Sequence, residues 1–132
     1  MTTSLPNAHQ KKICFLIEDD PDDQNIFLMA LTTFNSSIEL VIVSDGVKAL
    51  KKINEDESFL PDYIFLDLNM PYMSGKECLI KLRAIDRLSN VPIIIYSTVK
   101  YFGELTSFGA SGFVSKPISM KDIIKTLDEI LK

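Results

Sequence analysis

The chain has 132 residues, of which 46% are apolar, and a formal net charge of −4 at pH 7, values that fit one globular domain with a substantial core. The acidic balance disfavours nucleic acid as a partner, because phosphate backbones are bound by basic surfaces. No apolar stretch approaches the roughly 18 residues of a membrane span, and residues 1–12 lack the apolar centre of a signal peptide, so we expect a cytoplasmic protein that binds no membrane.

The first elements follow a polar leader. We expect residues 1–12 to be flexible and residues 13–132 to form a single domain. An uninterrupted apolar run over 13–17 predicts a strand buried on both faces, because polar and apolar residues do not alternate in it. Apolar residues at helical spacing over 26–34 predict the first helix, and Asp22 and Asp23 suit its opening turn.

The middle of the chain repeats the order of a strand followed by a helix. Residues 38–43 are apolar apart from Glu39 and rich in β-branched side chains, which predicts a second strand, and Val47, Leu50 and Ile53 mark the inward face of a second helix. The run 63–66 predicts a third buried strand that delivers Asp67 to a turn. A third helix is predicted from Ser74.

The last third supplies two more strands, over 93–96 and 112–115. A short fourth helix is predicted over 100–108, and a fifth over 119–131. Five strands alternating with five helices predict an α/β fold, a parallel sheet covered on both faces.

Polar side chains that follow these strands converge, because the carboxyl ends of parallel strands lie at one edge, where open α/β sheets bind ligands. The first strand contributes Glu18, Asp19 and Asp20, and the third contributes Asp67. Carboxylates crowded in this way repel one another by on the order of 4 kcal/mol per close pair. A hard cation that takes oxygen ligands, Mg²⁺, would neutralise them.

The fourth and fifth strands add a hydroxyl, Ser97, and a cation, Lys116. A carboxylate nucleophile, a metal clamp, a cation and a hydrogen-bond donor are what formation of an aspartyl phosphate requires. Each residue also has an ordinary interpretation: Asp67 and Ser97 as turn residues, 18–23 as a solvated acidic loop and Lys116 as surface. Their coincidence at the ends of successive strands favours the site.

Four motifs together resemble the receiver domain of two-component response regulators. They are Glu18-Asp19-Asp20, Asp67 to Pro71, Tyr96-Ser97-Thr98, and Gly109 to Pro117. The resemblance covers 13–132 and implies a flavodoxin-like sheet of order 2-1-3-4-5.

The resemblance also implies residue roles. Asp67 would be the phosphoacceptor, and the metal ligands would be Glu18, Asp19, Asp67 and the backbone carbonyl of Asn69. Ser97 would be the switch hydroxyl, Phe113 the switch aromatic, and Lys116 the conserved-type lysine, followed by a cis bond to Pro117.

The function implied is that of a stand-alone receiver, which takes a phosphoryl group from a histidine kinase or a phosphotransfer protein and signals by contact with a downstream protein. It would be no enzyme beyond slow autophosphorylation and autodephosphorylation, and a monomer or a weak homodimer. A receiver-shaped binding module that takes no phosphate is the main alternative. A dehalogenase-type phosphatase would need an Asp in place of Asn69, and a flavodoxin would need a phosphate loop in place of 18–23.

The sequence departs from the receiver pattern in one segment. Lys116 follows Ser97 by only 19 positions, about three fewer than is usual in this family, which is roughly one helical turn. We therefore expect the fourth helix to be short or displaced. Val99, two positions after Ser97, cannot orient a water, which predicts slow loss of the phosphoryl group. Cys14 and Cys78 are expected to be buried free thiols.

Overall fold

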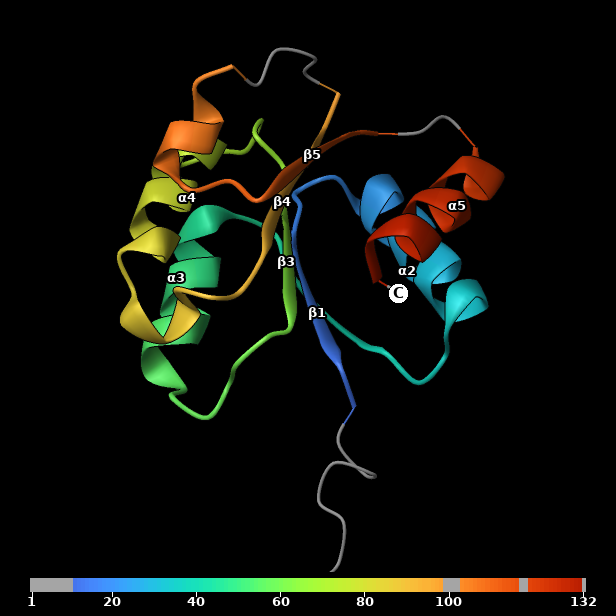
Figure 1. Ribbon diagram of the computed structural model, residues 1–132, viewed down its shortest axis with the longest axis horizontal. Coiled ribbons are helices and arrows are strands. Elements are labelled where there is room, and N and C mark those ends of the chain that lie inside the picture. Colours follow the sequence, from blue (N-terminus) through green and yellow to red (C-terminus); the bar gives the residue numbers. More distant parts are fainter. Residues whose placement is uncertain (1–10, 99–102, 117–118, 132) are drawn as a thin grey trace, which may run out of the picture.

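A five-stranded parallel sheet in the order β2-β1-β3-β4-β5 runs through the centre of the molecule (Figure 1). The structure is a computed structural model that describes residues 11–98, 103–116 and 119–131. The strands are β1 (Ile13–Ile17), β2 (Glu39–Val43), β3 (Tyr63–Leu66), β4 (Ile93–Ser97) and β5 (Gly112–Ser115). The predicted fold class and strand order are confirmed.

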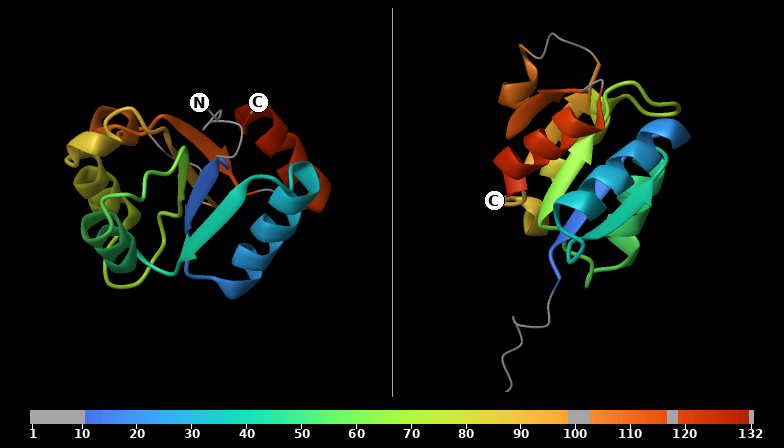
Figure 2. Two further views of the ribbon diagram at one scale, coloured as in Figure 1. Left: turned by 90° about the horizontal axis from the view of Figure 1, so that it is seen from below. Right: turned by 90° about the vertical axis from the view of Figure 1, so that its right-hand side faces the viewer.

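Helices cover both faces of the sheet. The α-helices of the described residues are α2 (Pro21–Phe34), α3 (Gly46–Glu55), α4 (Gly75–Arg83) and α5 (Met120–Leu131), and the 3₁₀ helices are η1 (Asp86–Leu88) and η2 (Leu105–Phe108). Helices α2 and α5 lie together on one face, and α3 and α4 lie on the other (Figures 1 and 2). In the part of the chain that the structure describes, no helix is both long and apolar enough to cross a membrane.

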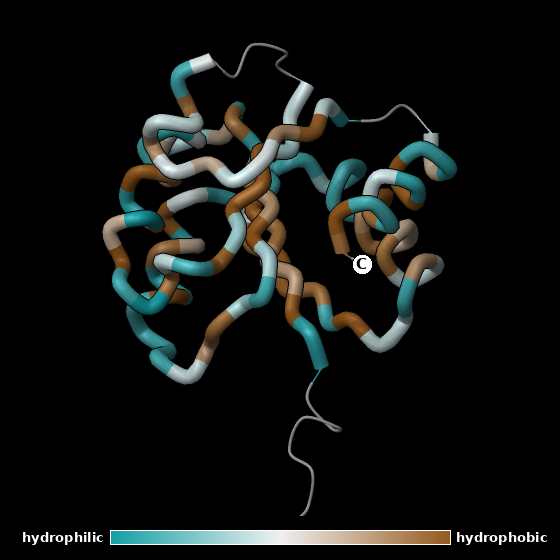
Figure 3. The backbone as a smooth tube through the Cα atoms, in the orientation of Figure 1, coloured by the Kyte–Doolittle hydropathy of each residue, from teal (hydrophilic) through white to brown (hydrophobic). Residues whose placement is uncertain are grey.

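Helix packing on both faces of the sheet explains why the central strands β1, β3 and β4 are continuous apolar runs. Successive side chains of a strand point to opposite faces, so Phe15 packs towards α3 and α4 while Leu16 packs towards α2 and α5. Figure 3 shows the resulting concentration of hydrophobic residues along the central strands. Both cysteines are free and buried, as predicted, and burial raises the pKa of each thiol to about 12.

Short side chains at the helix starts fix the loops that lead out of the strands. Asp20 caps α2 by accepting a hydrogen bond from the Asp22 amide at 2.9 Å. Asp45 caps α3 and Ser74 caps α4 in the same way. Each cap satisfies an amide that has no partner inside its helix, and the loops between strand and helix are thereby held in place.

The prediction of an α-helix over 100–108 is wrong for the residues of this range that the structure describes. Residues 105–108 form the 3₁₀ helix η2, which ends at Gly109 with φ 103°, and the start of the predicted helix lies outside the described residues. The described residues therefore contain four α-helices. What the structure describes of the predicted fourth helix is one short 3₁₀ helix. Val47, predicted to open the buried face of α3, is instead 49% exposed, because the face that packs carries Ala49 and Ile53.

Side chains of α4 hold η2 against the sheet. Arg83 donates to the Gly109 carbonyl at 2.7 Å and to Ser111 Oγ at 2.9 Å. Lys76 forms an ion pair with Glu104 at 2.9 Å. These contacts hold the residues that flank η2 beside α4.

Candidate functional site

Backbone hydrogen bonds place the predicted site residues side by side at the carboxyl edge of the sheet. The Glu18 amide donates to the Val43 carbonyl at 3.0 Å, and the Asp67 amide donates to the Ile17 carbonyl at 3.1 Å. The Lys116 amide donates to the Ser97 carbonyl at 2.9 Å. The strand pairing thus continues one residue past β1, β3 and β5, so the sheet itself sets the spacing of the site.

Lys116 lies at the centre of this group. Its Nζ is 2.6 Å from Glu18 Oε1, 2.8 Å from Asp23 Oδ2 and 3.1 Å from Asp67 Oδ2, and its side chain is only 11% exposed. Burial alone would lower the pKa of the lysine, but its bonds to Asp23 and Glu18 raise that pKa above the usual value. Lys116 therefore stays charged at the pH of a cell.

Glu18 is the most deeply buried carboxyl group of the site, with 1% of its surface exposed. Burial raises its pKa from 4.5 to about 7; the bond to Lys116 opposes this rise and the nearby Asp67 adds to it. Its Oε1 contacts Lys116 as an ion pair but without the angles of a hydrogen bond. The contact between Glu18 and Lys116 is thus a close, buried ion pair.

Carboxylate oxygens of Glu18, Asp19 and Asp67 come within 4.8 Å of one another. Three such oxygens on one side of a crevice fit a hard divalent cation, which takes oxygen ligands and keeps waters at its remaining positions. Asp20, the third acidic residue of the predicted loop, is not in this group because its side chain caps α2. The donor set therefore suits a divalent metal.

Of the remaining predicted residues, Ser97 and Asn69 adjoin this group through hydrogen bonds with Lys116 and Asp67. Ser97 is fully buried at the end of β4. The Asn69 amide donates to Asp67 Oδ1 at 3.2 Å, which steadies the carboxylate from the side of the loop after β3. Phe113 is half-buried on β5. Val99 and the peptide bond to Pro117 lie outside the described residues.

Three residues of the site were not predicted from the sequence. Asp23 was expected only to open a helix, yet it binds Lys116. Its position four residues before the buried Phe27, on the same face of α2, is the signal that could have revealed it.

Gly75 is the second. A Cβ on Gly75 would lie 2.5 Å from Leu68 Cα, so only glycine lets α4 start this close to the loop after β3.

Tyr72 is the third. It is 85% exposed and has φ 69°, and the Met73 amide donates to the Pro71 carbonyl at 2.7 Å across it. A turn closed over three residues with positive φ is rare and strained. A bulky, exposed side chain therefore stands in a strained turn of the loop that follows Asp67.

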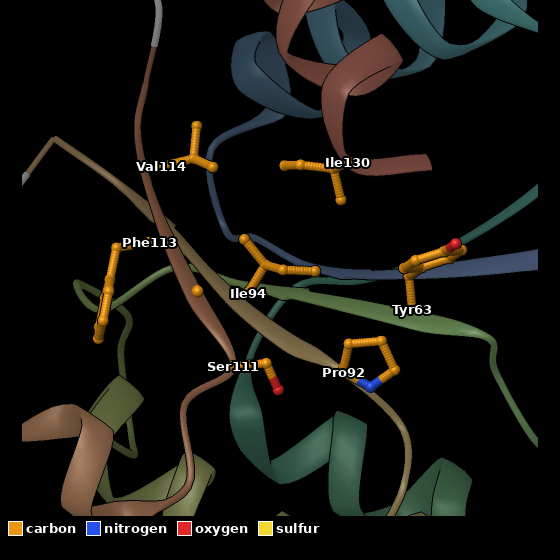
Figure 4. Close-up of a pocket in the computed structure, with 8 residues that line it drawn as sticks. Tyr63, Pro92, Ile94, Ser111, Phe113, Val114 and Ile130 are labelled. Carbon is orange, nitrogen blue, oxygen red and sulfur yellow. The ribbon is translucent and has the colours of Figure 1, made fainter. Parts of the chain in front are cut away.

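A separate pocket of about 370 Å³ lies between β5, β4 and the end of α5. Tyr63, Pro92 and Ser111, which line it, are near the starts of their strands, so the pocket is at the end of the sheet opposite the carboxylates (Figure 4). Phe113 and Val114 project from opposite sides of β5 at this pocket. The pocket is mainly apolar and takes no part in the acidic site.

A doubly covered parallel sheet that carries an acidic crevice and one buried lysine at its carboxyl edge defines a receiver-type α/β module. The sequence profile of the response regulator receiver domain matches residues 14–128. The chain belongs to this family, whose members accept phosphoryl groups and are generally not enzymes themselves.

Individual relatives agree with this assignment. Hybrid signal transduction histidine kinase D of Dictyostelium discoideum is 31% identical over 124 residues, which cover 92% of this chain and 8% of that protein. Response regulator Rcp1 of Synechocystis is 25% identical over 130 residues, which cover 93% of this chain and 88% of that protein. The chain thus matches a small part of the first relative and most of the second.

Solved structures share the fold. The Mn²⁺-bound form of response regulator Rcp1 is similar with a TM-score of 0.77 and 26% identity, over 90% of this chain and 91% of that one. The phosphorylated cyanobacterial phytochrome response regulator RcpA gives a TM-score of 0.82 at 24% identity, over 92% and 91%.

Proposed function

We propose that Asp67 is the phosphoacceptor of this receiver domain. The observation that carries the proposal is the position of its carboxylate, which lies at the carboxyl end of β3, 3.1 Å from Lys116 Nζ and grouped with Glu18 and Asp19. A carboxylate oxygen of Asp67 attacks the phosphorus of a phosphohistidine. The phosphorus–nitrogen bond breaks, and the imidazole leaves with the electron pair and takes up a proton.

Glu18, Asp19 and Asp67, with the backbone carbonyl of Asn69, would hold Mg²⁺ in this proposal. When bound, the ion supplies neutralisation of the charge that develops on the transferred phosphoryl oxygens. The carboxylate grouping of these residues and the Mn²⁺-bound relative support a divalent ion here. The choice of Mg²⁺ follows from its preference for one or two carboxylates plus phosphate oxygens.

Lys116 and Ser97 would bind the phosphoryl oxygens once the group is on Asp67. Ser97 lies at the end of β4, and its carbonyl already accepts from the Lys116 amide, so the two residues are coupled through the sheet. Movement of these two side chains would draw Phe113 inward and change the surface around β5 and α5. A phosphoryl group acts in such switches through new charge and new hydrogen bonds.

The partners proposed are a sensor histidine kinase or a phosphotransfer protein upstream, and an unidentified protein downstream. Residues 13–132 would act as one receiver domain, monomeric or weakly dimeric. Its own chemistry would be limited to slow autophosphorylation by small phosphodonors and slow autodephosphorylation.

If Val99 accounts for slow loss of phosphate, Val99→Glu should lose phosphate from Asp67 faster than wild type, and equal rates would reject that role.

Incubation with acetyl phosphate and Mg²⁺, followed by intact mass measurement, tests the proposal. Wild type should gain one phosphoryl group, and Asp67→Asn should gain none. Asp62→Asn is the matched control, because Asp62 is an exposed carboxylate at the opposite end of the same strand, and it should be labelled like wild type. Absence of the adduct on wild type would favour the binding module that takes no phosphate.

A further inference from the structure

The ammonium group of Lys116 is closely surrounded by carboxylates: it donates hydrogen bonds to Asp23 and Asp67 and forms an ion pair with Glu18. It has three N–H bonds and three carboxylate neighbours, Glu18 at 2.6 Å, Asp23 at 2.8 Å and Asp67 at 3.1 Å. An incoming phosphoryl oxygen has to compete for Lys116 with these three carboxylates, two of which already accept its hydrogen bonds.

Asp23 differs from the other two neighbours. Glu18 and Asp67 belong to the group of carboxylates that fits a cation, and Asp23 does not. It also comes from α2 rather than from the end of a strand, and its side chain is 33% exposed, whereas that of Glu18 is 1% exposed and that of Asp67 is 7% exposed. Water can replace Lys116 at Asp23 more readily than at either of the buried carboxylates.

The position of Asp23 is fixed by the packing of its helix. Phe27, four residues later and on the same face of α2, is fully buried and packs edge-to-face against Phe65 and Tyr96, with ring centroids 5.0 Å and 5.5 Å away. This anchor turns the first turn of α2 towards the carboxyl edge of the sheet. Asp23 is thus held at Lys116 by the core rather than by a mobile loop.

We propose that Asp23 is a positioning residue that restrains Lys116 in the unphosphorylated state and so opposes the binding of a phosphoryl group at Asp67. The inference rests on the proposed function of Asp67. Removing the carboxylate of Asp23 frees one N–H of Lys116, and the site should then bind a phosphoryl-like anion more tightly.

Titration with beryllofluoride in the presence of Mg²⁺ measures this effect at equilibrium. Asp23→Asn and Asp23→Ala should bind beryllofluoride roughly threefold to fivefold more tightly than wild type, the range expected for loss of a partly exposed ion pair. Asp23→Glu keeps the charge and should bind like wild type. Asp22→Asn is the matched control, since it removes the same charge from the same helical turn at an exposed position.

Two outcomes overturn the inference: an affinity of Asp23→Asn equal to that of Asp22→Asn, or an affinity below that of wild type. A second measurement needs no ligand. The nitrogen-15 resonance of the Lys116 ammonium should shift in Asp23→Asn and not in Asp22→Asn, and an unchanged resonance refutes the restraint. If wild type binds no beryllofluoride while the resonance does shift, the proposed function fails and the contact between Asp23 and Lys116 stands.

Discussion

Lowering the pH should stabilise the metal-free protein, and Glu18 is the reason. Burial, opposed by Lys116 and reinforced by Asp67, raises the pKa of Glu18 from 4.5 to about 7 in the folded state. In the unfolded chain the pKa of this carboxyl group is about 4.3. Between the two values the folded state holds a proton that the unfolded state has released. The resulting stability is complete below the unfolded pKa and is lost as the pH rises through the folded pKa.

The size of the effect follows from the two pKa values. A tenfold difference in proton affinity corresponds to about 1.4 kcal/mol, so the free energy of unfolding should be greater by about 2 kcal/mol at about pH 5 than at about pH 7.5. Lys116 stays charged over this range because its own pKa is raised. The gain in the free energy of unfolding therefore comes from protonation of Glu18 and not from a change in the charge of Lys116.

Urea unfolding in the presence of a chelator, at both pH values, measures this gain. Glu18→Gln should abolish it, because the amide does not titrate. Glu129→Gln, an exposed residue of α5, should retain it. The same pH dependence in wild type and in Glu18→Gln would refute the reasoning and would mean that Glu18 titrates as it does in the unfolded chain.

Substitutions at three further positions test the segments around α4 by urea or thermal unfolding. Gly75→Ala should destabilise the protein by about 1–3 kcal/mol, because the new Cβ would lie 2.5 Å from Leu68 Cα; a neutral result would mean that α4 shifts freely. Tyr72→Gly should stabilise by about 1 kcal/mol, because Tyr72 has φ 69°, whereas Tyr72→Ala should not. Arg83→Met should destabilise by about 2 kcal/mol and speed amide exchange near Gly109, whose carbonyl Arg83 binds; unchanged exchange would mean that η2 is held by other contacts.

The fold was predictable because its signals are local. Strands β1, β3 and β4 are continuous apolar runs that lead to a polar residue, and the sheet buries both of their faces. The grouping of the proposed site residues was predictable for the same reason, since Glu18, Asp67, Ser97 and Lys116 directly follow or end their strands. A parallel sheet then brings these residues together without any further information.

The errors arose where spacing was ambiguous or contacts were distant. Phe102, Leu105 and Phe108 repeat every three residues, which matches the three residues per turn of a 3₁₀ helix better than the 3.6 of an α-helix. In α3 the small residues Gly46 and Ala49 face the core, whereas the larger Val47, which the spacing of apolar residues places inward, is exposed.

The contact between Asp23 and Lys116 could not be predicted from spacing within one element, because 93 residues separate the two. That separation also has a consequence for how the protein folds. Contacts between such distant parts of a chain form late, since a long loop must close first. Glu18, Asp23 and Asp67 are made before β5 during synthesis, so they stay solvated until β5 brings Lys116 to them. The ion pairs of Lys116 should accordingly slow unfolding and have little influence on the rate of folding.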